Sequence, residues 1–215
     1  MFEGNFQPLS PLPFFQVRSS CYYVEPEQAP QMIKNKTYCL PSLEKLTQEF
    51  HFAQLNMGWN ELGLYFLCEV NSPFQDVFYP DFDRGDSLEI FIDTRDVKTS
   101  RFISKFCHHF FFLPQAVDDH KAEEVTRFRN EDSHELCDPK DLHVKSEIHR
   151  KGYTLNIYIP SHCLYGYDPS QFKRLGFTYK INRVGQSSQH FSVLSEEFKI
   201  DQPSLWGTII LKNSP

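Results

Sequence analysis

The nine residues GDSLEIFID, at positions 85–93, constrain the fold of this chain more than any other stretch. Side chains alternate between the two faces of a β-strand, so every second residue here is expected to point into a core. The inward side chains are Leu88, Ile90 and Ile92. The outward side chains are Glu89, Phe91 and Asp93. The run therefore predicts a strand with one packed face and one face that can bind a polar ligand.

Short apolar runs separated by turn residues recur along the rest of the chain. The runs that predict strands are 51–55, 63–70, 87–94, 106–113, 142–150, 153–160, 176–184 and 204–211. Residues 57–61 and Lys151-Gly152 are interpreted as hairpin turns, and residues 116–138 as a short helix or a ragged hairpin. No amphipathic run of 10–15 residues separates the strands, which argues against a parallel α/β fold. The pattern predicts an all-β, antiparallel β-sandwich of the jelly-roll-like kind.

The domain organisation follows from length and proline content. A chain of 215 residues suits one large β-sandwich, and 14 prolines with 15% aromatic residues favour strands and turns. Residues 1–48 are rich in proline and are predicted to be an N-terminal extension, an arm or edge strands packed on the main domain. Residues 49–215 are predicted to form the sandwich.

Charge and cysteine content limit the partners and the compartment. A net charge of −6 argues against nucleic acid as a partner, and the absence of a run of 18 apolar residues argues against a membrane span. None of the six cysteines has CxxC spacing, so free thiols in a reducing compartment are expected. Without a recognisable secretion signal a cytoplasmic location is expected, or an extracellular one if a signal has been removed. Nothing indicates the oligomeric state.

Five segments resemble, in the same order, the strand motifs of family 9 carbohydrate-binding modules and the wider class of DOMON-like β-sandwiches. They are LGLYFLCEV at 62–70, GDSLEIFID at 85–93, GYTLNIYIP at 152–160, GFTYKIN at 176–182 and PSLWGTIIL at 203–211. The resemblance covers residues 50–213. It implies a β-sandwich and a non-catalytic module that binds carbohydrate, without naming the sugar.

The resemblance also implies a binding site. Family members hold a terminal sugar between two tryptophans, whose positions fall on Asp83 and Ile200 here. The family's polar glutamate falls on Glu89 and its asparagine on Asn182, while its glutamine falls on Lys180. Because the two clamp positions are not aromatic, an aromatic platform has to come from other residues. The candidates are Trp59, Phe78, Tyr79 and Phe82.

The candidate ligand-binding residues combine the resemblance with strand geometry. Arg95 and His109 are expected to converge with Glu89 on one sheet face. The full predicted set is Glu89, Arg95, His109, Lys180, Asn182 and Trp59. The resemblance also makes a calcium ion possible through Asp81, Asp83 or Asp86, and no other cofactor is predicted. Glu89 and Asp93 lie ~13 Å apart on a strand, which is too far for the paired carboxylates of a retaining or inverting glycosidase.

Two alternatives remain open. The first is a protein-interaction or structural sandwich that has lost sugar binding, which the missing tryptophans favour. The second is a metal protein or enzyme that uses Cys107, His109 and Arg95. On a strand Cys107 and His109 share a face and His108 points the opposite way, so a zinc site would combine Cys107 and His109 with His134 and Cys137.

Overall fold

The computed structural model describes residues 16–129, 131–193 and 199–215. Strands are the main regular structure among these residues: β1 (Arg18–Tyr23), β2 (Ala53–Asn60), β3 (Gly63–Val70), β4 (Ser87–Asp93), β5 (Cys107–Val117), β6 (His120–Glu124), β7 (His143–His149), β8 (Gly152–Pro160), β9 (Arg174–Asn182), β10 (Gln189–His190) and β11 (Gly207–Lys212). The helices are short: α1 (Ala29–Met32), α2 (Glu44–Thr47), and the 3₁₀ turns η2 (Lys36–Tyr38), η3 (Phe82–Arg84), η4 (Pro139–Asp141), η5 (Ser161–Cys163) and η7 (Pro203–Leu205). The predicted all-β class is confirmed.

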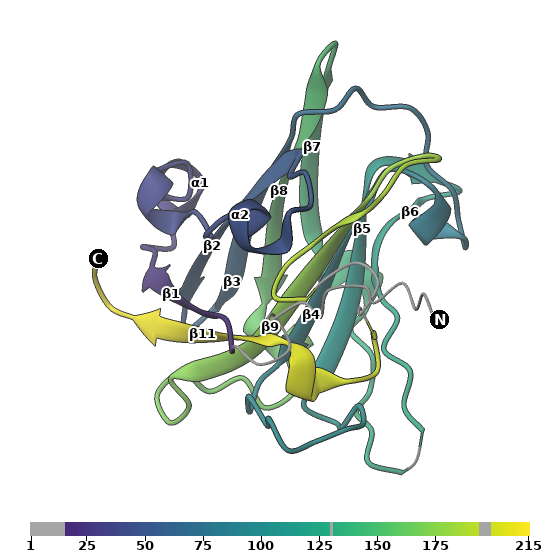
Figure 1. The fold of residues 1–215 in the computed structure, drawn as a ribbon. Coiled ribbons are helices and arrows are strands. Elements are labelled where there is room, and N and C mark those ends of the chain that lie inside the picture. The colour runs from purple at the N-terminus through teal and green to yellow at the C-terminus, as the bar shows by residue number, and fades with distance from the viewer. Residues whose placement is uncertain (1–15, 130, 194–198) are drawn as a thin grey trace, which may run out of the picture.

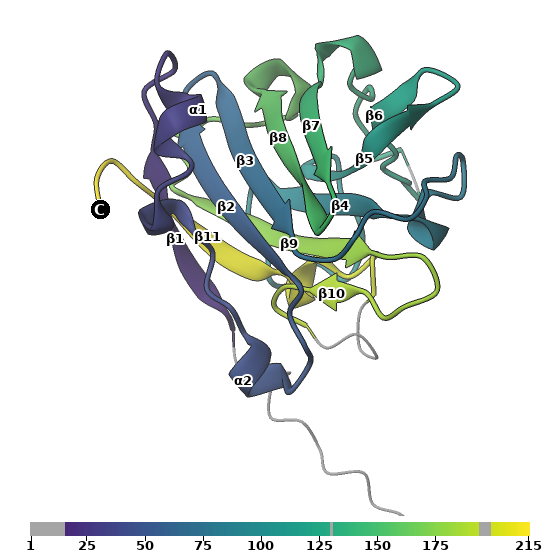
Figure 2. The same ribbon diagram turned by 90° about the horizontal axis from the view of Figure 1, so that it is seen from above.

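The strands form one strongly curled sheet in the order β6-β5-β4-β9-β11-β1-β2-β3-β8-β7, with β10 paired to β9. Figures 1 and 2 show that the sheet bends over on itself, so that its two halves face each other as the layers of a sandwich. The two edge strands of the sheet, β6 and β7, lie close to each other. Lys121 Nζ on β6 donates a hydrogen bond to Ser146 Oγ on β7 at 2.9 Å. The sheet is therefore nearly a closed barrel.

The strand β1 lies inside the sheet, although the proline-rich region that contains it was expected to contribute an arm or edge strands. It pairs in parallel with β11 on one side and with β2 on the other. The other strand pairings among the described residues are antiparallel. Cys21 of β1 is fully buried in the core. The expected edge position is wrong for β1, because its two neighbours, β11 and β2, come from later parts of the chain and enclose it.

The core between the two layers is built by the alternation that the sequence predicted. Leu88, Ile90 and Ile92 of β4 lie in one cluster with the apolar face of β3, which consists of Leu64, Phe66, Cys68 and Val70. Phe66 of β3 stacks on Phe177 of β9 across the interior, with ring centroids 6.0 Å apart. The predicted apolar face of β4 is thus confirmed.

The turn between β2 and β3 is shorter than the sequence suggested. Asn60 pairs directly with Gly63, so the turn consists of Glu61 and Leu62, and the residues before it continue the strand. The Asn60 side chain accepts a hydrogen bond from the Leu62 amide at 2.9 Å, which closes the turn. Gly63 has φ +150°, and a Cβ there would lie 2.2 Å from the Ile159 carbonyl oxygen. The tight turn therefore needs glycine at position 63.

Residues 116–138 contain the turn and second strand of a hairpin, and the described residues of this range form no helix. β5 extends to Val117 and β6 begins at His120, and the two turn residues, Asp118 and Asp119, both have positive φ. Aspartate tolerates this left-handed conformation better than most residues, and the mirror-image turn suits the twist of a β-hairpin. The predicted ragged hairpin is confirmed, with a register shift between Phe112 and Val117.

The expectation of six free thiols is wrong, because Cys137 and Cys163 form a disulfide. Their sequence separation is 26 residues, and the bond ties the segment after β6 to η5. Cys21, Cys39, Cys68 and Cys107 are free. Sequence spacing did not show the pairing, because the sandwich fold brings the two segments together. The cellular compartment stays a prediction.

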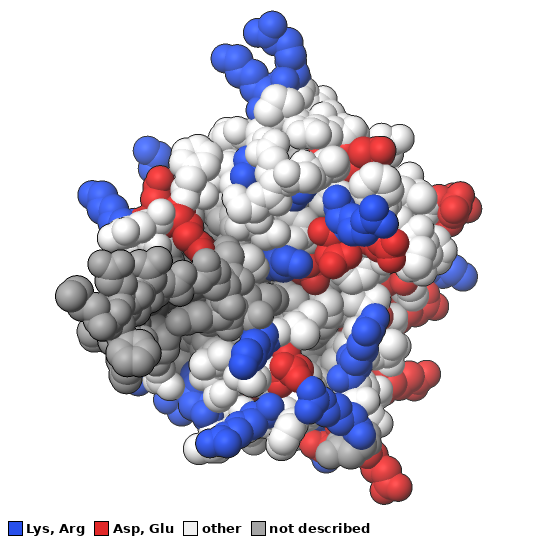
Figure 3. Space-filling view, turned by 45° about the vertical axis from the view of Figure 1, so that its right-hand side comes forward, with Lys and Arg blue, Asp and Glu red and all other residues white. Residues whose placement is uncertain are grey.

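Charges of both signs are mixed over the surface. Figure 3 shows Lys and Arg side chains interspersed with Asp and Glu on the face that it presents. Of the helices that the structure describes, none has the length and apolarity needed to cross a membrane.

Candidate ligand-binding site

A cavity of about 740 Å³ opens over the outer face of β4, β5 and β9. Its polar floor contains Glu89, His109 and Lys180, one residue from each strand. Its walls come from the loop around η3, which supplies residues 79–83, and from residues 125–129 after β6. The rest of the lining comes from Ile103, His108, Glu123, Ile200 and Asp201. The cavity is of the size that holds small ligands in proteins.

Strand register brings the polar floor together around Glu89. Glu89 lies directly opposite Lys180 on β9, and diagonally opposite His109 on β5, whose direct partner is Phe91. His109 Nε2 donates to Glu89 Oε2 at 2.8 Å, and Lys180 Nζ lies 3.3 Å from Glu89 Oε1. Asn182 Nδ2, at the end of β9, donates to the same Oε1 at 2.8 Å. The structure therefore gathers four of the predicted residues into one cluster, the Glu89 cluster.

The Glu89 carboxylate is ionised at neutral pH although its side chain is only 3% exposed. Burial alone would raise its pKa, but the hydrogen bond and charge of His109, the charge of Lys180 and the Asn182 amide lower the pKa of Glu89 to about 2. His190 on β10 lies opposite Lys180. Burial and the Lys180 charge lower the pKa of His190 to about 4, so this imidazole is neutral at pH 7.

Three aromatic rings line the cavity above this polar floor. Phe82 stacks on Phe111 at 4.4 Å, and Tyr79 stacks on His120 at 3.8 Å, so each ring is held in place by a second one. Tyr79 and Phe82 were among the sequence candidates for an aromatic platform. Phe128, from the segment after β6, was not. The alternation Arg127-Phe128-Arg129 is the signal that could have indicated an aromatic residue on a polar wall.

The two positions where the resemblance implies tryptophans, Asp83 and Ile200, both line the cavity. Residues 40–214 match the family model described as carbohydrate family 9 binding domain-like. The chain belongs to this family. No curated protein matches the chain in sequence.

Two solved family 9 structures are similar to this family 9 domain over most of its length. A family 9 carbohydrate-binding module from Caldicellulosiruptor kristjanssonii in complex with cellotriose shares 19% identity and a TM-score of 0.67, with 92% of this chain and 95% of that chain covered. A family 9 module from the same organism in complex with glucose shares 17% identity and a TM-score of 0.62, with coverage of 92% and 97%. At these identities the likeness supports the fold.

The prediction that Trp59 contacts the ligand is wrong, because Trp59 belongs to the core of this family 9 domain. It lies on β2, is 1% exposed, and packs edge-on against Tyr23 with centroids 5.4 Å apart. Its Nε1 donates to the Lys212 carbonyl at 3.0 Å. The error follows from the turn: residues 57–61 were interpreted as a loop, whereas the strand continues to Asn60. Phe78 is exposed but does not line the cavity.

Arg95 also lies outside the cavity. The Asp93 carboxylate accepts hydrogen bonds from the amides of Arg95 and Val97 and so turns the chain at the end of β4. The Arg95 guanidinium lies between Phe106 and Phe172, 4.4 Å and 3.7 Å from the ring centroids, and donates to the Gly166 carbonyl. The expected convergence with Glu89 is therefore wrong, because the turn directs Arg95 onto the loop that precedes β9.

Replacing this arginine tests a structural role. Arg95→Ala should lower the free energy of unfolding by about 1–3 kcal/mol, because it removes two cation–π contacts and the hydrogen bond to Gly166. Chemical denaturation measures the change, and Arg150→Ala, in the exposed turn between β7 and β8, is the matched control. A loss of ligand affinity with unchanged stability would contradict this assignment.

The aspartates considered for calcium do not converge. Asp81 pairs with Arg84 at 3.5 Å, and Asp83 lines the cavity. The Asp86 carboxylate accepts the amide of Gln75 at 2.6 Å and that of Asp76 at 3.3 Å, so it supports the loop before η3. None of the three belongs to a group of three or more potential metal ligands among the described residues. Calcium binding stays a prediction without a shared site.

The zinc set predicted from sequence is not assembled either. Cys137 is in the disulfide, His109 is bonded to Glu89, and the Cys107 thiol lies 3.6 Å from Ser104 Oγ. Burial raises the pKa of Cys107 to about 12, so the thiol is protonated and a poor nucleophile. The predicted opposite orientation of the neighbouring histidines is confirmed, because His108 bonds to Glu124 on the core side of β5.

Proposed function

We propose that this family 9 domain binds a short saccharide, or the end of a longer one, in the cavity over β4, β5 and β9. The observation that carries the proposal is the Glu89 cluster on the cavity floor beneath three aromatic rings. A sugar has the matching chemistry, since its hydroxyls need polar partners and its ring faces stack on aromatic side chains. The similar Caldicellulosiruptor kristjanssonii modules hold cellotriose and glucose, which supports the same ligand class.

Each part of the cavity has a role in this proposal. Glu89 accepts hydrogen bonds from sugar hydroxyls, while Lys180 donates to a hydroxyl oxygen. Their partners, His109 and Asn182, hold the carboxylate in place before the ligand arrives, which reduces the entropy that binding costs. Phe82 and Phe128 line the cavity from two different segments and provide stacking surfaces in place of the absent tryptophans.

The same geometry favours binding over hydrolysis. A general acid must be protonated near the working pH, whereas the pKa of Glu89 is held at about 2 by its cationic and amide partners, against the effect of burial. Asp93, the other carboxylate on the outward face of β4, accepts backbone amides in the turn that follows the strand. We therefore propose a non-catalytic role.

Ligand binding by the wild-type protein is the first test. A glycan array, followed by calorimetric titration with the best saccharide, should give saturable binding. The absence of binding to every mono- and oligosaccharide at millimolar concentration would contradict the proposal. It would favour the alternative of a protein-interaction or structural domain that has lost sugar binding.

Aromatic substitutions then locate the site. Phe82→Ala and Phe128→Ala should each weaken binding about tenfold, or ~1.4 kcal/mol, because each removes a stacking face. Phe78→Ala is the matched control, since Phe78 lies close in sequence to Phe82 and outside the cavity lining. Titration of all three variants, with melting curves to verify folding, measures the effect. Equal losses in the control and the two cavity variants would place the site elsewhere.

A further inference from the structure

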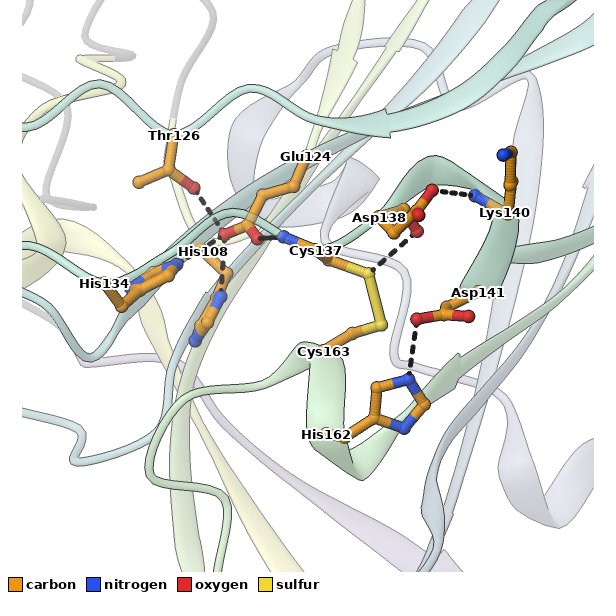
Figure 4. Close-up of a disulfide and its surroundings, with 10 residues drawn as sticks. All are labelled: His108, Glu124, Thr126, His134, Cys137, Asp138, Lys140, Asp141, His162 and Cys163. Atoms are coloured by element: carbon orange, nitrogen blue, oxygen red, sulfur yellow. Dashed lines mark hydrogen bonds and ion pairs between the residues drawn. A yellow bond between two sulfur atoms is a disulfide. The ribbon is translucent and has the colours of Figure 1, made fainter.

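A second polar cluster adjoins the ligand cavity, and its His108 side chain lies on the opposite face of β5 from that of His109. It contains His108 of β5, Glu124 at the end of β6, and His134 in the segment before η4, and Figure 4 shows the three side chains converging. We call it the His108–Glu124–His134 cluster. The exposed fractions of the three side chains are 0%, 0% and 2%. Burying three polar side chains this deeply costs free energy, so their partners have to compensate for the lost hydration.

The coordinating atoms of these side chains are close together. His108 Nδ1 and His134 Nε2 each lie 2.8 Å from the same oxygen, Glu124 Oε1. One ligand atom from each residue lies within 4.8 Å of the other two. Zinc bonds of about 2.0–2.2 Å place tetrahedral ligand atoms about 3.4 Å apart, so side-chain adjustments on the order of 1 Å would create a coordination sphere.

The hydrogen bonds of His134 show that this place needs a positive charge. Its Nδ1 lies 2.7 Å from the Lys105 carbonyl oxygen, which can only accept, so Nδ1 carries a hydrogen. In the neutral ring Nε2 then has a bare lone pair, and it faces the Glu124 carboxylate. Two acceptors at 2.8 Å repel each other unless a proton or a metal ion lies between them. His108 repeats the arrangement more loosely, with Nε2 3.5 Å from the Tyr165 carbonyl.

We propose that His108, Glu124 and His134 bind one divalent transition-metal ion, with zinc as the expected metal. Two imidazoles and one carboxylate form a ligand set suited to zinc and neighbouring metals, and a water molecule can supply the fourth ligand. This set replaces the zinc ligands predicted from the sequence and shares His134 with them. It uses none of the residues of the Glu89 cluster.

The surroundings of the cluster are those of a supported metal site. The Lys105 carbonyl orients His134. A backbone carbonyl is a usual hydrogen-bond partner for the ring nitrogen of a histidine that does not bind the metal. Thr126 Oγ1 donates to Glu124 Oε1 at 2.8 Å, and the Cys137 amide donates to Glu124 Oε2 at 2.8 Å. Cys137 is held in turn by its disulfide to Cys163. The carboxylate is thus positioned by groups from two sides.

A metal here would stabilise one wall of the ligand cavity. Residues 125–129 of that wall begin directly after Glu124, and His134 follows five residues later. An ion bound to both residues would link the two ends of this segment to β5. Zinc binding is therefore expected to raise the melting temperature, because it stabilises the folded state and not the unfolded chain.

Metal analysis of the whole chain tests the proposal. The protein is stripped with a chelator, dialysed against zinc and then against metal-free buffer, and its zinc is measured by mass spectrometry. We expect one zinc per chain, a higher melting temperature than in the stripped protein, and visible absorption bands of tetrahedral Co²⁺ after cobalt loading. Glu124→Gln and His134→Gln should lose all three signals, while His149→Ala, an exposed histidine on β7, should retain them.

Two outcomes would overturn the proposal. One is a wild-type protein that retains well below one zinc per chain and shows no melting shift and no cobalt bands. The His108–Glu124–His134 cluster would then be a hydrogen-bonded group of charges without a metal. The other is equal retention of zinc by the wild type and the two cluster variants. The three wild-type readouts do not depend on whether the variants fold. Neither outcome affects the sugar titrations, so failure of the metal site and failure of the proposed function are distinguishable.

Discussion

Glu89→Gln is expected to lower the free energy of unfolding by about 3 kcal/mol at pH 7 and to abolish saccharide binding. The magnitude follows from the pKa of Glu89, which is about 2 in the folded protein against an ordinary value of 4.5. Glutamine keeps the shape and the hydrogen bond to Asn182, but it leaves the charge of Lys180 and the polar edge of His109, both partly buried, without their anion. Loss of one partner of a buried pair is costly for this reason.

The effect should depend on pH in a defined direction. Because the folded pKa is depressed, the ionised carboxylate contributes its full stability above pH ~4.5, the pKa of the unfolded chain. This contribution is lost as the pH falls from that value through about 2. The difference in unfolding free energy between wild type and Glu89→Gln should therefore be constant from pH 6 to 8 and shrink in acid.

Urea denaturation at several pH values measures this difference, with Glu147→Gln on β7 as the matched control, since Glu147 is exposed. The control should change stability by less than about 0.5 kcal/mol at every pH. A constant difference down to pH 2, or unchanged saccharide affinity in Glu89→Gln, would show that Glu89 is neither the stabilising anion nor the centre of the site.

Trp59→Ala should destabilise the domain by about 3–5 kcal/mol, the cost of removing a large buried aromatic side chain. The substitution leaves a cavity between β2 and Tyr23 and removes the hydrogen bond to Lys212. Trp59→Phe should cost less, because most of the packing volume is retained. Both variants should keep the saccharide affinity of the wild type at temperatures where they are folded, since Trp59 is separated from the cavity.

Guanidinium denaturation followed by titration of the folded variants checks both halves of this prediction. Leu62→Ala is the control, because Leu62 is 54% exposed in the adjacent turn and should change stability little. Weaker saccharide binding by a fully folded Trp59→Phe protein would restore the hypothesis that Trp59 contacts the ligand. A stability loss as small as that of Leu62→Ala would contradict its place in the core.

Much of the candidate site could be predicted from sequence because it depends on the alternation of side chains between the two faces of a strand. The outward direction of Glu89, and the opposite directions of His108 and His109, follow from the period of two along a strand. The resemblance added Lys180 and Asn182 on a neighbouring strand. Glu89, His109 and Lys180 lie inside their strands, where backbone geometry leaves little freedom, and Asn182 is the last residue of β9.

The errors occurred where strands end. Whether Trp59 lies in a loop or in the core depends on where the β2–β3 turn begins, and the direction of Arg95 depends on how Asp93 caps the chain after β4. Phe128 reaches the cavity through the segment after β6, whose course is determined by packing and not by periodicity. A turn that is shifted by one or two residues moves a side chain to another part of the molecule.

By itself, the sequence determined the β class, the inward and outward faces of the main strands and the carboxylate at the centre of the polar floor. These properties depend on residues adjacent in the chain. Only the tertiary structure decided the parallel insertion of β1, the Cys137–Cys163 disulfide, the aromatic walls and the meeting of His108, Glu124 and His134. The physical reason is that these contacts join distant segments, and strand alternation sets the direction of a side chain but not the partner that it meets.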